Sequence, residues 1–325
     1  MEKLLLSTGN LMPQGFLGTD KSNTELKSSL QSNFQAARED AAYQVPDNGT
    51  LSPAAAPAHP PYTKWTSTSD DNKTLYIPTL DFTHSALEEE RSQYDITVKV
   101  FFLPGEDRAA REEHIREAID LVLRELHMPN VDLLVLQFPG VYFDEETESC
   151  PDKIKSRGPR QADPEPLESQ VETWKIAEKL HKEGLVQRLG VAEFGAERLA
   201  SFVDQVSIQP DVDQISLRDC CSVPKPLTSL AKDKKIELLV HNDTVNILPR
   251  GTLRELLDDE GADILGLPSA KLQQGHKRKR SDASDHAERM QGDIEPQWVV
   301  KYTAVVRNRG VVENKGYFAC AKYRE

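Results

Sequence analysis

Residues 94–140 read YDITVKVFFLPGEDRAAREEHIREAIDLVLRELHMPNVDLLVLQFPG and hold a strand, a helix and a second strand in succession. In the first strand, apolar and polar residues alternate as far as Pro104-Gly105, which is typical of a β-strand and its end. Apolar residues then recur at helical spacing until Pro129 ends the helix. The run 131–138 is almost wholly apolar, as expected of a strand buried on both faces of a parallel sheet.

The same alternation of strands and helices continues along the chain. The spacing predicts strands at 4–7, 75–77, 188–194, 212–217, 236–240 and 310–322, and helices at 24–38, 171–180, 196–206, 226–233, 252–258 and 296–308. Repeated βα units indicate the α/β class, and about eight strands favour a closed (β/α)8 TIM-type barrel. We therefore expect a single barrel domain over 1–325. Disordered loops are expected at 44–72, 144–166 and 269–293, where proline and charged residues accumulate.

The composition argues against several classes of protein. The 325 residues carry 40 Lys and Arg against 53 Asp and Glu, and the net charge of −13 argues against binding to nucleic acid or to an anionic membrane. No apolar run reaches the roughly 18 residues of a membrane span, and the N-terminus lacks the apolar region of a signal peptide. Four cysteines without a CxxC pair predict neither a disulfide framework nor a metal site. We expect a cytoplasmic protein, with a nuclear fraction if the basic run Lys277–Arg280 is an import signal rather than a solvated loop.

Functional side chains of a βα barrel lie at the C-terminal ends of its strands. In this sequence those positions hold Gln137, Glu193, Cys220, Cys221, His241 and Asp243. We expect the side chains of His241 and Asp243 to point apart, and we interpret them as the end of a strand and the cap of the next turn. The two cysteines have no recognisable base nearby, so we interpret them as ordinary thiols. No glycine-rich phosphate loop is present in the sequence.

Three stretches resemble the aldo-keto reductase superfamily: VDLLVLQFPG at 131–140, ETWKIAEKLHKEGLVQRLGVAEF at 172–194, and the segment 212–243. Reductases of this superfamily use NADPH and a tyrosine proton donor tuned by lysine, aspartate and histidine. The resemblance places Lys99 at the family's lysine and Gln137 at its histidine. No tyrosine stands at the expected position upstream, and the late phosphate-binding segment is missing. The resemblance therefore implies a vestigial lysine, no catalytic residue and no cofactor; the alternative is an NADPH-dependent reductase with a rearranged site.

A closer resemblance is to the regulatory subunits of glutamate–cysteine ligase. It rests on LLLSTGNLM at 4–12, VDQISLRDCC at 212–221, PLTSLAKDKKIELLVHND at 226–243 and QWVVKYTAVVRNRGVVENKGYFACAKYRE at 297–325. It implies a non-catalytic subunit that forms a heterodimer with the ligase catalytic subunit, raises its effective affinity for glutamate and relieves its inhibition by glutathione. Residues in these stretches that catalysis does not explain are the candidates for partner binding: Cys220, Cys221, His241, Asp243, Arg307, Arg309, Lys315 and Lys322. The alternative for the C-terminal stretch is that it only completes the barrel, with its charges in solvent.

Overall fold

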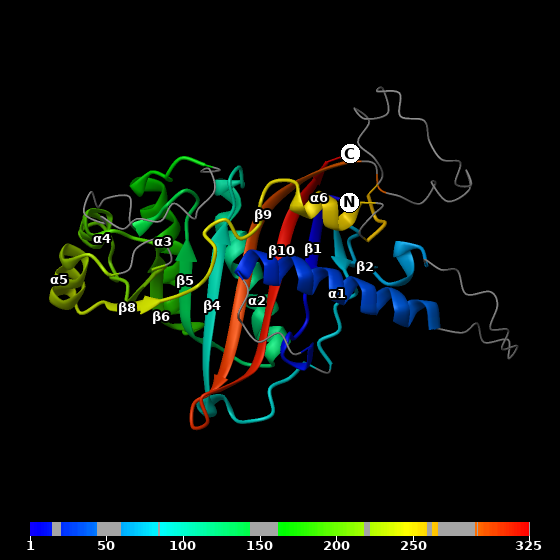
Figure 1. The fold of residues 1–325 in the computed structure, drawn as a ribbon, viewed down its shortest axis with the longest axis horizontal. Helices are drawn as coiled ribbons and strands as arrows, with labels where there is room; N and C mark the ends of the chain where they lie inside the picture. The colour runs from blue at the N-terminus through cyan, green and yellow to red at the C-terminus, as the bar shows by residue number, and fades with distance from the viewer. Residues whose placement is uncertain are drawn as a thin grey trace, which may run out of the picture.

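The computed structural model describes residues 1–14, 21–43, 60–83, 85–143, 162–217, 222–258, 262–265, 290 and 292–324. These residues form an α/β fold in which one twisted sheet of ten strands carries helices on both faces (Figure 1). The strands are β1 (Lys3–Ser7), β2 (Ser67–Thr68), β3 (Thr74–Ile77), β4 (Tyr94–Phe102), β5 (Val131–Gln137), β6 (Val186–Ala192), β7 (Val212–Ile215), β8 (Glu237–Val240), β9 (Asp293–Val306) and β10 (Val311–Arg324). The helices are α1 (Ser22–Tyr43), α2 (Arg111–Leu126), α3 (Leu167–Lys182), α4 (Ala196–Val203), α5 (Lys225–Lys234) and α6 (Thr252–Leu257), with 3-10 turns η1 (Met12–Gln14), η2 (Tyr62–Lys64), η3 (Arg91–Gln93) and η4 (Arg108–Ala110).

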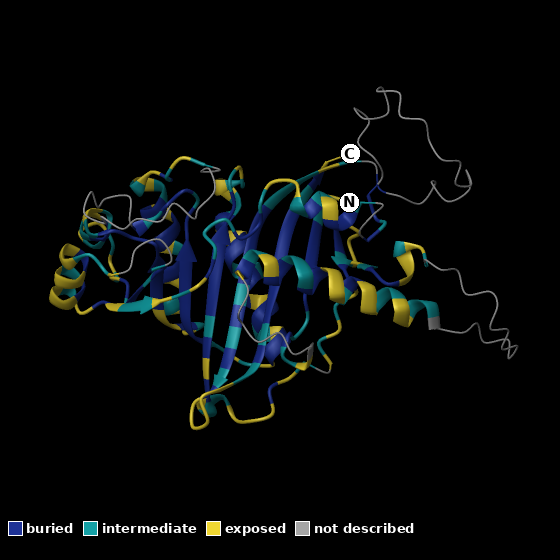
Figure 2. Cartoon of the chain, in the orientation of Figure 1, coloured by how far each residue is buried: buried dark blue, intermediate teal, exposed yellow. Residues whose placement is uncertain are grey.

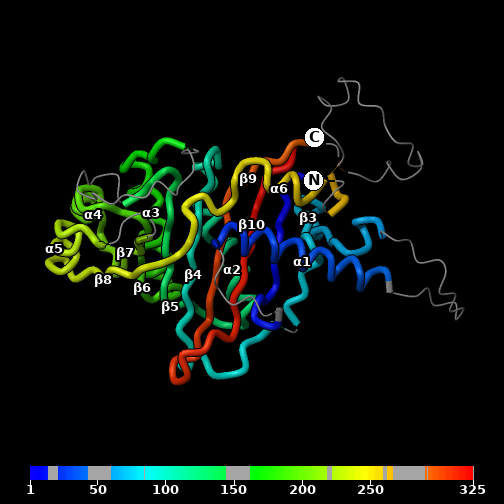
Figure 3. The backbone as a smooth tube through the Cα atoms, viewed as in Figure 1, coloured from blue at the N-terminus to red at the C-terminus, as the bar shows by residue number. Residues whose placement is uncertain are grey.

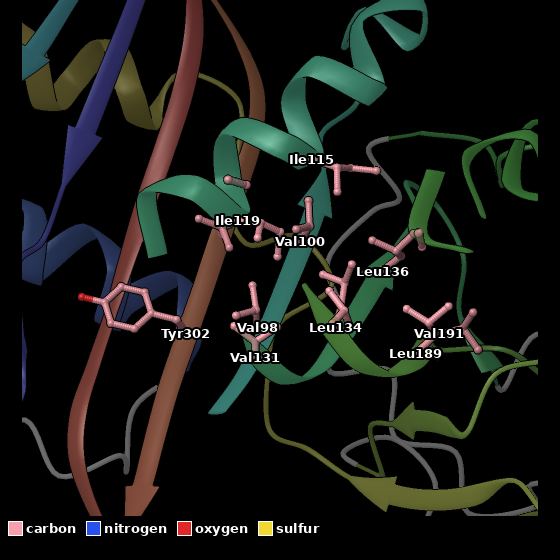
Figure 4. Close-up of a cluster of buried hydrophobic side chains, with 14 of the residues drawn as sticks. Val98, Val100, Ile115, Ile119, Val131, Leu134, Leu136, Leu189, Val191 and Tyr302 are labelled. Atoms are coloured by element: carbon pink, nitrogen blue, oxygen red, sulfur yellow. The ribbon is translucent and has the colours of Figure 1, made fainter. Parts of the chain in front are cut away.

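Half of the sheet is built from parallel βα units. Strands β4 to β8 are parallel neighbours, and helices α2 to α5 connect them in turn. Every residue of β5 is buried, as a central strand of a parallel sheet requires. In the main hydrophobic core, Ile115 and Ile119 of α2 lie over Val100 and Leu134 of the sheet (Figure 4). The predicted α/β class and the predicted succession of βα units are confirmed.

The other half of the sheet contains a long antiparallel pair, and here one sequence prediction is wrong. The segment predicted as a helix at 296–308 belongs to strand β9, which pairs with β4 on one side and β10 on the other. Trp298, Val300 and Tyr302 face one core, while Val299 faces the other, which is the period of two of a strand. Pro296 lies beside an irregularity in the β9–β10 register, a position where proline is tolerated in a sheet.

The sheet is open, with the order β2-β3-β1-β10-β9-β4-β5-β6-β7-β8. Strands β9 and β10, the orange and red segments of the tube trace, lie between β1 and β4 (Figure 3). Among the described strands, no pairing joins β2 to β8, so the closed eight-stranded barrel is not formed by these residues. The predicted number of strands differs from the observed number because the prediction counted one C-terminal strand. The structure has two strands there, each 14 residues long.

Two hydrophobic cores hold the helices to the sheet. The larger lies between the sheet and α2 to α5, and the second lies on the opposite face, under α1 and α6. Leu26, Leu30 and Phe34 of α1 contribute to this second core together with Val299 and Tyr317. The central strands are accordingly buried along most of their length, whereas the helices expose their outer faces (Figure 2).

The predicted disordered loops fall mostly outside the described residues, which exclude 44–59, 144–161 and 266–289. At their ends, the loop prediction differs from the structure. Residues 60–72 contain η2 and β2, and the ring of Trp65 lies 5.8 Å from that of Phe34. At 162–166, the buried carboxylate of Glu165 binds Arg111. Each segment holds a side chain that contacts a partner far away in the sequence, and local composition does not reveal such partners.

Candidate functional site

Four of the five parallel strands bring polar and charged side chains to one end of the sheet. Lys99 lies in β4 and Gln137 ends β5, whereas Glu193 directly follows β6; His241 and Asp243 follow β8. Each of these residues occupies the C-terminal half or end of its strand, where βα folds place their functional groups. The structure thus places Gln137, Glu193, His241 and Asp243 near Lys99, and it adds Lys301 of β9, which lies opposite Lys99 in the strand register.

Asp243 binds two lysines at the centre of this cluster. Its Oδ2 lies 3.2 Å from Lys99 Nζ, and its Oδ1 lies 2.5 Å from Lys301 Nζ. The side chains of Asp243 and Lys99 are 7% and 3% exposed, and that of Lys301 is 21% exposed. Burial opposes the charged form of Asp243, but the two ammonium groups outweigh it and hold its pKa well below the ordinary value. Burial likewise lowers the pKa of Lys99, and the nearby carboxylates of Asp243 and Glu193 oppose that shift.

His241 joins the cluster through both ring nitrogens. Its Nδ1 accepts the backbone N–H of Asp243 at 3.0 Å, so the proton of the neutral ring lies on Nε2, 3.0 Å from Glu193 Oε1. Burial lowers the pKa of His241, as does the charge of Lys99, whereas the carboxylates of Glu193 and Asp243 oppose that shift. The expectation that His241 and Asp243 point apart is wrong: Nδ1 lies 3.7 Å from Asp243 Oδ2, because residues two apart in an extended chain share a side.

The backbone around Glu193 is fixed in an unusual conformation. Its φ of 65° lies in the left-handed region, which non-glycine residues seldom adopt. The N–H of Glu193 donates to the Gln214 carbonyl at 2.8 Å, and its carboxylate accepts the Ser216 N–H at 2.9 Å. Strained residues of this kind persist where the surrounding contacts determine them, and they are common at functional sites.

Gln137 and the chain after β8 close the cluster. The Gln137 side-chain amide donates to the Val245 carbonyl at 3.4 Å, and the residue is 2% exposed. Thr244, next along the same segment, donates its backbone N–H to Ser22 Oγ at 2.7 Å and so attaches the segment to α1. Among the described residues, Gln137 Oε1 has no hydrogen-bond partner. The buried side chain of Gln137 therefore lies against the chain that follows β8.

Tyr317 of β10 is the tyrosine beside the cluster. Lys301 Nζ lies 6.0 Å from the centre of its ring, but its hydroxyl donates to Glu25 Oε1 at 2.6 Å. Burial raises the pKa of Tyr317 well above the ordinary value, and the Glu25 carboxylate adds to this effect. A tyrosine that donates a proton in catalysis needs a lowered pKa, so this environment has the opposite effect. Sequence reasoning missed Glu25, because α1 reaches the cluster from the opposite end of the chain.

The predicted partner-binding residues are not brought together. Each basic residue of the C-terminal stretch binds an acidic side chain of the same chain: Arg307 with Asp132 at 2.6 Å, Arg309 with Glu89 at 2.6 Å, Lys315 with Glu25 at 2.7 Å and Lys322 with Asp107 at 2.6 Å. Arg307 and Arg309 lie at the β9–β10 turn, whereas Lys322 lies near the far end of β10. Cys220 and Cys221 lie outside the described residues.

A cavity of about 300 Å³ lies away from the cluster, between the first turns of α2 and α3. Arg111 lines it, but Glu106, Glu165 and Thr173 accept from its guanidinium nitrogens. In the part of the chain that the structure describes, no group of three or more His, Cys, Asp or Glu side chains is arranged to hold a metal ion. None of the helices in that part is long and apolar enough to cross a membrane.

Comparison with known proteins assigns the class. Residues 77–261, more than half of the chain, match the family model described as the aldo/keto reductase family, and the chain belongs to that family. Within this class the chain is similar to a putative glutamate–cysteine ligase regulatory subunit of Schizosaccharomyces pombe, 26% identical over 270 residues that cover 81% of this chain and 84% of the relative. The glutamate–cysteine ligase regulatory subunit of Homo sapiens is 22% identical over 73% of this chain and 69% of its own length. An aldose reductase of Schistosoma japonicum has a TM-score of 0.34 and 23% identity, over 52% of this chain and 50% of the other.

The resemblance to reductases raises the question of NADPH, and the described residues do not fit it. A nicotinamide ring needs open space beside the family's lysine, but Lys99 is 3% exposed and its ammonium group binds Asp243. Gln137 at the family's histidine position is held by the Val245 carbonyl, and the chain after β8 covers both residues.

Proposed function

We propose that this chain is a non-catalytic regulatory subunit that binds the catalytic subunit of glutamate–cysteine ligase. The observation that carries the proposal is the similarity to the fission-yeast putative regulatory subunit, which extends over 81% of this chain and 84% of the relative. The 270 aligned residues exceed the span of the reductase family model, residues 77–261, so the similarity extends beyond that model. The proposal includes a cytoplasmic heterodimer, with a nuclear fraction through Lys277–Arg280, which lie outside the described residues.

The regulatory effect is a coupling between two binding events. As the resemblance implies, the subunit raises the effective affinity of the ligase for glutamate and relieves its inhibition by glutathione. For this it must bind the active conformation of the catalytic subunit more tightly than the inhibited one. A shift of 5- to 150-fold in either affinity needs a difference of only about 1–3 kcal/mol.

The filled cluster supports the absence of reductase activity in this proposal. Carbonyl reduction needs a proton donor next to the hydride acceptor, and Gln137 cannot supply a proton as a histidine does. The Tyr317 hydroxyl already donates to Glu25, and Lys99 binds Asp243 instead of lowering the pKa of a tyrosine. The alternative of a rearranged NADPH-dependent reductase predicts that NADPH raises the melting temperature and is oxidised by aldehydes or ketones. Turnover that disappears on Lys99→Met would establish that alternative.

The decisive experiment is co-purification with the ligase catalytic subunit, followed by glutathione inhibition curves with and without this chain. We expect a stable complex in which more glutathione is needed for half inhibition and less glutamate for half saturation. Failure of the two chains to associate, or identical inhibition curves, would contradict the proposal. The same preparation, assayed with NADPH and a panel of aldehydes, tests the reductase alternative in parallel.

A further inference from the structure

Among the described strands, β8 forms one edge of the sheet, and little protects its last three residues. Its four residues Glu237–Val240 pair with β7 on one side only, and they are exposed or half-buried along their length (Figure 2). Edge strands are commonly shortened, charged or interrupted by proline, because their free N–H and C=O groups pair readily with another chain. The opposite edge follows this rule, since β2 has only two residues. The β8 edge does not, because Leu238, Leu239 and Val240 follow Glu237 without a proline or a further charge.

The outward backbone groups of β8 can be assigned from the pairing. The N–H groups of Glu237 and His241 donate to Asp211 and Ile215 on the β7 side. Because backbone groups alternate along a parallel strand, the N–H and C=O of Leu238 and Val240 point away from β7.

Val240 also offers an apolar side chain to a partner. It is 60% exposed, the highest value among the exposed large hydrophobic residues of the described chain. An exposed apolar side chain beside free backbone groups is the arrangement that β-strand addition uses, with main-chain bonds for affinity and side-chain contacts for specificity.

The surroundings of this edge are basic on an acidic protein. Residues 222–240, which comprise α5 and β8, carry four lysines and two carboxylates, whereas the whole chain has a net charge of −13. Lys232 and Lys235, at the end of α5 and just before β8, are exposed and form no ion pair with a described residue. A local excess of positive charge favours an acidic partner, and it disfavours a second copy of this chain, which would place lysines against lysines.

We infer that β8 is the docking edge for an extended acidic segment of the partner, which adds to the sheet as an eleventh strand and places a carboxylate near Lys232 and Lys235. The inference rests on the proposed function, because it takes the ligase catalytic subunit as the source of that segment. The added strand pairs with the backbone of Leu238 and Val240, and its side chain covers Val240.

Proline at position 240 tests the pairing. Val240→Pro removes one outward N–H and leaves the bonds to β7 in place, whereas Val240→Ala keeps that N–H and shortens the side chain. We expect Val240→Pro to weaken binding of the catalytic subunit about tenfold and Val240→Ala about threefold or less, measured as Kd by titration. If Val240→Pro lowers the melting temperature, Val240→Asp replaces it, because a carboxylate on the edge disfavours pairing with an acidic segment without removing a backbone donor.

The charge of the edge is tested by Lys232→Glu, with Lys182→Glu as the matched control. Lys182 is also an exposed lysine in the last turn of a helix, but it belongs to α3. We expect only Lys232→Glu to slow association, and the difference to disappear at high salt. Wild-type chain that fails to bind the catalytic subunit refutes the proposed function itself. Wild-type chain that binds, together with position-240 variants that bind equally well, refutes the β8 edge and leaves the proposed function standing.

Discussion

Replacing Asp243 by asparagine should destabilise the fold strongly, because it removes the carboxylate that Lys99 and Lys301 share. Removing one member of a buried ion pair leaves the other charge without compensation and costs about 3–5 kcal/mol. Lys99 is 3% exposed, so its ammonium group would bear the full cost of an unpaired buried charge. Lys301 is 21% exposed and retains some contact with solvent. We therefore expect a loss near the lower bound, about 3 kcal/mol in the free energy of unfolding.

A second substitution separates charge from packing. Lys99→Met alone leaves Asp243 bound to Lys301 and should be mild. Added to Asp243→Asn, it removes the uncompensated cation, so the double variant should recover about 1–2 kcal/mol relative to Asp243→Asn. Urea unfolding at pH 7 measures all three variants. Charge coupling in the cluster would be refuted if Asp243→Asn lowered the free energy of unfolding by less than about 1 kcal/mol. It would also be refuted if the double variant were less stable than Asp243→Asn alone.

The control for this experiment is an exposed carboxylate with equally good geometry. Glu183 accepts from both terminal nitrogens of Arg116 at 2.8 and 2.9 Å but is 36% exposed. Glu183→Gln should leave the unfolding midpoint near that of wild type, because solvent screens surface ion pairs.

The pH dependence of the Asp243 effect has a defined sign. The pKa of Asp243 is depressed in the folded protein, so its stabilising contribution is complete above the pKa of an unfolded aspartate, about 3.9. The difference between wild type and Asp243→Asn should stay constant from pH 8 to pH 5 and narrow only at more acid pH. A difference that already narrows between pH 7 and pH 6 would assign the effect to another group.

Two further predictions concern buried and exposed partners elsewhere. Glu125→Gln should stabilise the fold at pH 8 but not at pH 5. Burial raises the pKa of Glu125 to about 7, so the buried carboxyl is neutral at pH 5 and becomes an unfavourable buried charge as the pH rises through that value. Urea unfolding of wild type and variant at both pH values measures the difference. Arg307→Glu should lower the melting temperature more than Arg309→Glu, because Arg307 binds Asp132, which is 8% exposed, whereas Arg309 binds Glu89, which is 42% exposed. Equal melting temperatures would contradict the second prediction.

The parallel half of the fold was predictable because its signals are local. The apolar run at 131–137 and the helical spacing before it need no knowledge of distant residues. Strand β9 was not predictable in this way, since Pro296 also fits the first turn of a helix. This segment is a strand because it pairs with β4 and β10. The sequence of β9 alone does not reveal that pairing.

The residues of the candidate site were likewise predictable where the sequence signal is local, and not where it depends on distant residues. The rule for parallel strands predicted that Gln137 and Asp243 lie at the C-terminal ends of their strands, and the resemblance to reductases singled out Lys99; in the structure Asp243 binds Lys99. Lys301 was missed because its segment was predicted as a helix, and Glu25 because α1 lies far from the cluster in sequence. Charge counting along the C-terminal stretch identified the basic residues, but it could not show that each of them binds an acidic side chain of the same chain.

The cluster and the open edge are connected through the chain that follows β8. A lysine that activates a catalytic group must leave that group free to react, whereas a buried lysine with a structural role needs a counter-ion. Asp243 supplies this counter-ion from the segment just after β8, and Lys99 and Lys301 hold it from β4 and β9. Ion pairs to strands at the centre of the sheet therefore fix the C-terminal end of an edge strand that has a neighbour on only one side. An edge held in place in this way loses little conformational freedom when a partner strand adds to it, and preorganisation of this kind favours tight binding.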